Sequence, residues 1–95
     1  MRIARQKFCI TYKGKTFPII AILYKEKIKS YVFFIRFNFL KRYITIRINN
    51  LEEEKEKNTV EYYEFRNFFN EIIKNDNFNI LVKTMHEHFI QNDGM

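Results

Sequence analysis

The hydrophobic pattern changes halfway along the chain, and this change restricts the fold more than any other feature. In the first half, apolar residues alternate with polar ones, which is typical of strands that bury one face. From about residue 60 they recur every three or four positions, as on a helix with one apolar stripe. Strands followed by helices predict an α+β domain in which the helices cover one face of a sheet.

The first half contains four candidate strands joined by short connections. Gly14, between Lys13 and Lys15, can adopt the positive φ that a tight hairpin turn needs. Pro18 cannot donate a ladder hydrogen bond, so it must lie near a strand's start or on an edge. Residues 16–24 are apolar on both sides, which suits a strand covered on both faces. Short connections favour a four-stranded antiparallel meander, with strands at residues 8–12, 16–24, 28–37 and 43–48.

The second half contains two candidate helices. Cap signals at residues 58–61 precede a first apolar stripe, and the break at residues 75–77 precedes a second one that Gly94 closes. Residues 49–57 are interpreted as a charged connector or a first helical turn. A single helix over residues 51–74 is the alternative, because Asn50 is also a plausible cap. The stripes comprise Tyr62, Phe65, Phe68, Phe69, Ile72 and Ile73, and then Phe78, Leu81, Val82, Met85 and Phe89.

Length and composition predict a single domain over residues 1–95. The longest nearly apolar stretch, residues 31–40, carries Arg36 and Asn38 and is shorter than the roughly 20 residues of a membrane span. No apolar signal-peptide core follows the charged N-terminus. Cys9 is the only cysteine, which excludes an internal disulfide and fits a reducing compartment. We therefore expect a cytoplasmic protein without membrane contact.

Charge is divided between the two halves. Residues 1–48 hold twelve Lys and Arg against one acid, Glu26, for a net charge of +11. Residues 49–95 hold five Lys and Arg against ten Asp and Glu, for a net charge of −5. The sheet is expected to be basic and the helices acidic, so that the molecule is an electrical dipole.

Candidate catalytic and metal-binding residues are few. His86 and His88 are two positions apart, which on a helix directs them about 200° apart, whereas helical zinc sites use spacing i, i+4. Cys9 is interpreted as a small apolar filler within a strand. The chain has no Gly-rich phosphate loop and no Ser-His-Asp signature. We expect a non-enzymatic binding protein with no metal and no cofactor.

The basic half predicts a nucleic-acid or nucleoprotein contact. Cations at the hairpin ends would form a rim that attracts phosphate, and the outer face of the sheet would interleave aromatic and cationic side chains as single-strand platforms do. The rim comprises Lys13, Lys15, Lys25, Lys27, Lys29, Lys41 and Arg42, and the outer face comprises Phe34, Arg36, Tyr43 and Arg47.

Three other interpretations of these residues stay open. Lysines also solubilise proteins and protect strand edges from aggregation. Exposed aromatic residues also form homodimer interfaces. Small proteins rich in residues with AT-rich codons, as here, are often carried by phages or mobile elements. The alternative function is therefore an anti-CRISPR-like inhibitor that docks on a host effector protein, with an acidic run as phosphate mimic: Glu52, Glu53, Glu54 and Glu56.

Overall fold

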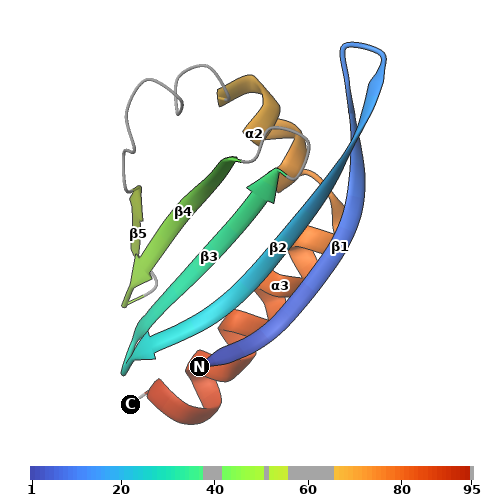
Figure 1. Cartoon of the computed structure of the whole chain (residues 1–95). Helices are drawn as coiled ribbons and strands as arrows, with labels where there is room; N and C mark the ends of the chain where they lie inside the picture. The colour runs from blue at the N-terminus through green and yellow to red at the C-terminus, as the bar shows by residue number, and fades with distance from the viewer. Residues whose placement is uncertain (38–41, 51, 56–65, 95) are drawn as a thin grey trace.

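A computed structural model describes residues 1–37, 42–50, 52–55 and 66–94. It shows an antiparallel sheet with helices on one face (Figure 1). The first four strands confirm the predicted meander, and a fifth strand extends it. The strands are β1 (Arg2–Tyr12), β2 (Lys15–Lys27), β3 (Ser30–Phe37), β4 (Arg42–Asn49) and β5 (Glu52–Lys55), which lie in the sheet in that order; α2 (Arg66–Ile73), α3 (Asp76–His88) and the π-helical turn η2 (Phe89–Asp93) follow.

The first hairpin turns at the predicted position. Lys13 and Gly14 have φ angles of 50° and 76°, so both residues adopt the left-handed conformation that a two-residue hairpin loop requires. A Cβ added to Gly14 would meet nothing within 4 Å, so the glycine is needed for the backbone and not for packing. Pro18 lies near the start of β2, opposite Cys9.

The core lies between the sheet and the helices. Ile19, Ala21 and Leu23 of β2 alternate with less buried residues, and their buried side shares the core with Phe33 and Phe37 of β3. Aromatic pairs join the two layers. The ring centroids of Phe33 and Phe78 are 5.2 Å apart, and those of Phe37 and Phe68 are 5.1 Å apart. The period-two pattern thus buries the predicted side of β1, β3 and β4.

The second helix begins and packs as its sequence predicts. Asn75 caps α3, because its side-chain oxygen accepts a hydrogen bond from the backbone nitrogen of Asn77 at 2.9 Å. Phe78, Leu81 and Met85 are its buried stripe. In α2 the predicted Phe68, Phe69 and Ile72 are buried, whereas Ile73 is 41% exposed. Tyr62, Phe65 and the predicted cap at residues 58–61 lie outside the described residues.

The acidic segment after β4 is a strand, so both its interpretation as a helical turn and the single helix over residues 51–74 are wrong at residues 52–55. Asn50 lies in the turn between β4 and β5 and takes a left-handed φ of 54°, which helps to reverse the chain. Its backbone N–H donates to the carbonyl oxygen of Lys29 at 2.8 Å, just beyond the end of the β3–β4 pairing. β5 then pairs antiparallel with β4. The open backbone edge of β4 outweighs the low strand propensity of Glu and Lys, a tertiary effect that local pattern does not contain.

The second face of β2 is less buried than the sequence predicts. The described helices contact β1 and β2 from one side of the sheet (Figure 1). On the other side, Ile20 and Ile22 are only half-buried and have no helix over them among the described elements. The apolar pattern of residues 16–24 therefore produces one core face and one partly exposed face. Within the described part of the chain, no helix has the length and apolar character needed to cross a membrane.

Candidate nucleic-acid interface

The face of the sheet opposite α2 and α3, here called the outer face, brings cations and aromatic rings from different strands together. Lys7 of β1 is in register with Ile20 of β2, Ile20 with Arg36 of β3, and Arg36 with Tyr43 of β4. These four residues form a crossing row. Residues in register on one face are neighbours, because adjacent strands lie about 4.8 Å apart.

Three cations of the outer face are accessible, two on β1 and one on β3. The side chains of Lys7 and Arg36 are exposed, and so is that of Arg5, which is in register with Ile22. Within the described residues none of the three lies within ion-pair distance of a carboxylate. A phosphate approaching this part of the face meets positive charge that no acid of the described chain neutralises.

Two aromatic rings lie stacked at the other end of the crossing row. The ring centroids of Phe34 and Tyr43 are 4.9 Å apart with an interplanar angle of 26°. Phe34 is half-buried, and Tyr43 is 51% exposed. Phe34 thus packs against the ring of an exposed tyrosine, and an exposed ring offers surface on which a further planar group can stack.

Arg47 is also on the outer face, but its guanidinium is already paired with a carboxylate of the same chain. Its Nε and Nη2 atoms donate to the two carboxylate oxygens of Glu26 at 3.0 and 2.9 Å. These hydrogen bonds from Arg47 hold the pKa of Glu26 below its usual value, and a weaker one from Ser30 Oγ contributes. Glu54 occupies the register position opposite Arg47. Arg47 therefore adds less positive charge to the outer face than Lys7 and Arg36 do.

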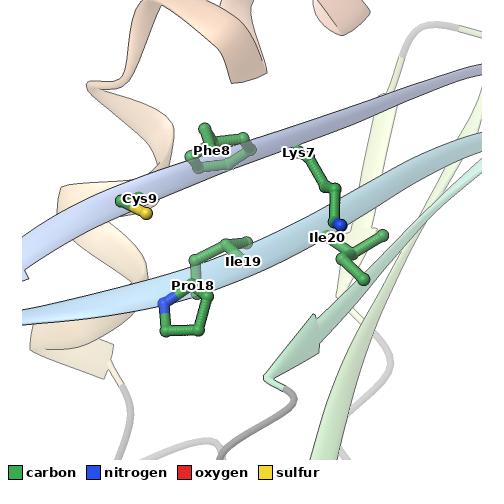
Figure 2. Close-up of a pocket in the computed structure, with 6 residues that line it drawn as sticks. All are labelled: Lys7, Phe8, Cys9, Pro18, Ile19 and Ile20. Carbon is green, nitrogen blue, oxygen red and sulfur yellow. The ribbon is translucent and has the colours of Figure 1, made fainter.

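A shallow apolar depression lies on the outer face between β1 and β2 (Figure 2). It has a volume of about 210 Å³ and is lined by the side chains of Lys7, Cys9, Pro18 and Ile20, with Phe8 and Ile19 between them. Figure 2 shows Lys7 beside Ile20, with Cys9 and Pro18 next to each other on the two strands. The depression therefore adjoins the cationic end of the crossing row.

The predicted cationic rim is divided between two ends of the sheet. Lys13 and Lys15 are at the β1–β2 turn, and Lys27 and Lys29 are at the β2–β3 turn, which Figure 1 shows at the opposite end. Lys41 lies outside the described residues, as does the side chain of Arg42 at the start of β4. The hairpin lysines therefore do not form one continuous surface.

Lys25 is engaged in a polar cluster that sequence reasoning missed. Its Nζ lies 2.9 Å from Asp93 Oδ1, and Tyr31 donates its hydroxyl hydrogen to Asp93 Oδ2. The Tyr31 hydroxyl also lies 3.3 Å from His88 Nδ1. The partners of Asp93 are 62 and 68 residues away, so no local pattern connects them. The cluster fastens η2 to the sheet on the helix-covered side.

The contacts within this cluster shift the pKa values of Tyr31 and Asp93 in opposite directions. Burial, and then the hydrogen bond to Asp93, raises the pKa of the Tyr31 hydroxyl far above its usual value. Hydrogen bonds from Tyr31 and Lys25 hold the pKa of the Asp93 carboxyl below its usual value. Tyr31 is thus a neutral donor and Asp93 a charged acceptor near neutral pH, which describes a structural anchor and not an acid–base pair poised for proton transfer.

Lys7 and Arg5 were also absent from the predicted site, although the sequence holds the signal that identifies them. Phe8 and Ile10 are buried, so the odd-numbered residues of this strand segment face the other side. The same alternation puts Cys9, which is exposed, on that side. Extending it toward the N-terminus reaches Lys7 and Arg5.

The remaining candidate residues are spread over the molecule. His86 is exposed, whereas His88 is half-buried against Tyr31, as their helical spacing predicts. In the part of the chain that the structure describes, no three His, Cys, Asp or Glu side chains are grouped as metal ligands. Glu52, Glu53 and Glu54 belong to β5, and Glu56 lies outside the described residues.

The chain was compared with families, with curated proteins and with solved structures. No family model, curated protein or solved structure matches it.

Proposed function

We propose that this protein binds nucleic acid, free or within a nucleoprotein complex, through the outer face of its sheet. The observation that supports the proposal most is the crossing row. It combines two exposed cations, Lys7 and Arg36, with the exposed ring of Tyr43 on a face that the described helices leave uncovered. Cations attract the phosphate backbone, and aromatic rings stack with bases of any sequence.

The charge of the four meander strands supports a polyanionic partner. Residues 1–48 contain a single acid, Glu26, and it is already bound to Arg47. A nucleic acid on the β1 side of the outer face therefore meets little repulsion. Lysine is also a common solubilising residue, but solubility alone does not require cations in register with a supported aromatic ring.

A binding titration tests the proposal. Fluorescence anisotropy of a labelled 20-nucleotide single strand is followed at about 50 mM salt with the wild type, a Lys7→Gln/Arg36→Gln variant and a matched Lys83→Gln control. Lys83 is an exposed cation on α3, in the helix layer. We expect the affinity to fall as salt rises. The double variant should bind at least tenfold more weakly than the wild type, and the control should bind with wild-type affinity.

Two results would count against the proposal. Absence of binding at low salt would overturn it and leave docking on a protein as the remaining hypothesis. Equal losses per removed charge would show that net charge alone acts, without the outer face; the Lys83→Gln control would then lose about half as much in log K as the double variant. Circular dichroism of each variant establishes that the fold is retained.

A further inference from the structure

We propose that the ligand is a single strand with unpaired bases, which crosses the sheet along the row Lys7–Ile20–Arg36–Tyr43. One base stacks on Tyr43, another enters the depression between Cys9 and Pro18, and phosphates lie near Lys7 and Arg36. This inference rests on the proposed function and adds to it the strandedness of the ligand and the position of two bases.

The dimensions of the row fit a few nucleotides. Lys7 and Tyr43 are three strands apart, which is about 14 Å at the usual strand spacing. Stacked nucleotides rise about 3.4 Å each, so this distance corresponds to about four stacked nucleotides, or fewer extended ones. Each base-sized surface has a cation beside it, because Lys7 lines the depression and Arg36 is in register with Tyr43.

The Tyr43 end of the row provides the first base position. The ring of Phe34 stacks against that of Tyr43 with centroids 4.9 Å apart, and 51% of Tyr43 stays exposed. Stacking of one base on such a ring changes affinity by about 5- to 100-fold in alanine substitutions. Arg36 is in register with Tyr43 and can reach the adjoining phosphate.

The depression provides the second base position. Its volume is about 210 Å³, and it is open to solvent. A planar group such as a pyrimidine can therefore lie against its apolar surface, partly exposed. Pro18 and Ile20 offer it apolar surface, and Lys7 is placed to bind the phosphate attached to it.

The same geometry disfavours duplex. Bases in a duplex are stacked inside the helix and present only their edges in the grooves. The exposed ring of Tyr43 and the depression both need a base that has left such a stack. No described element of the outer face projects from the sheet as a groove-reading helix would.

Cys9 makes the depression measurable. It is exposed, lines the depression and is the only cysteine in the chain. Its rate of alkylation by iodoacetamide is followed by intact-protein mass spectrometry with three probes: a pyrimidine single strand, a duplex of equal length, and inorganic polyphosphate as an anion without bases. We expect the saturating single strand to slow alkylation at least tenfold, and the other two probes to leave the rate within twofold of the free protein.

Substitutions test the first base position separately. Tyr43→Ala is expected to weaken single-strand binding about 5- to 100-fold, and Tyr43→Phe to retain wild-type affinity because it keeps the ring. Ile80→Ala, at a 48% exposed site on α3, is the matched control. If Tyr43→Ala fails to fold, the alkylation experiment on the wild type still tests the inference.

The outcomes separate this inference from the proposed function. Binding of the single strand without slower alkylation of Cys9, or equal protection by duplex or polyphosphate, would overturn the inference and leave the proposed function standing. If none of the three probes binds the protein, both the inference and the proposed function are overturned.

Discussion

Removing two cations from the outer face should reduce the salt dependence of binding by a defined amount. Each phosphate contact contributes about 0.7 to the slope of log K against log salt for a single strand. The variant Lys7→Gln/Arg36→Gln loses two contacts, so its slope should be shallower by about 1.4. Both side chains are exposed and have no carboxylate partner within the described residues, so the folded state should be little affected.

The difference is large enough to measure. Between about 50 and 200 mM salt, a change of 1.4 in slope means that wild-type affinity falls about sevenfold more than that of the variant. Anisotropy titrations at four salt concentrations give both slopes, and Lys83→Gln should have the wild-type slope. Equal slopes for the wild type and the double variant would refute the reasoning, because the two cations would then contact no phosphate.

Three further predictions concern stability. Tyr31→Phe removes the hydroxyl that donates to Asp93. The folded-state pKa of Asp93 lies below the usual 3.8, so the stability that the ionised carboxylate gives to the fold is present above that pH. This stability is lost as pH falls through the folded-state pKa. Urea unfolding should therefore separate wild type and variant more at about pH 7 than at about pH 3, and a difference independent of pH would contradict the assignment. Leu81→Ala, at a fully buried site, should lower the free energy of unfolding by about 2–5 kcal/mol, whereas Ile80→Ala beside it should change it by less than about 0.5 kcal/mol; similar effects of the two would place the helix in another orientation. Gly94→Ala puts a Cβ 2.8 Å from a backbone oxygen of the preceding turn and should lower the melting temperature, since that backbone has to shift; an unchanged temperature would show that η2 adapts freely.

The meander could be predicted because its signal is local. Alternation in residues 43–48 decides which side of β4 is buried, and Gly14 marks the first turn. β5 could not be predicted in this way. Its residues have low strand propensity, and they form a strand only because β4 offers an open edge and Asn50 reverses the chain there.

The candidate site was predicted in part. Phe34, Arg36 and Tyr43 do lie together on the outer face, as alternation within β3 and β4 indicates. Which cations are available depends on contacts between distant residues. Arg47 is bound to Glu26, 21 residues away, and Lys25 is bound to Asp93 near the C-terminus. Because these partners are distant in the sequence, the local pattern predicts both side chains to be exposed charges.

The order of the elements has a consequence for synthesis. All five strands precede the described helices in the chain, so the ribosome releases the meander before α3, whose Phe78, Leu81 and Met85 cover its core face, has been made. During that interval Phe33 and Phe37 face solvent, and exposed apolar strands of this kind are prone to aggregate. Yield in a cell should therefore respond to translation rate and to chaperones that hold nascent chains.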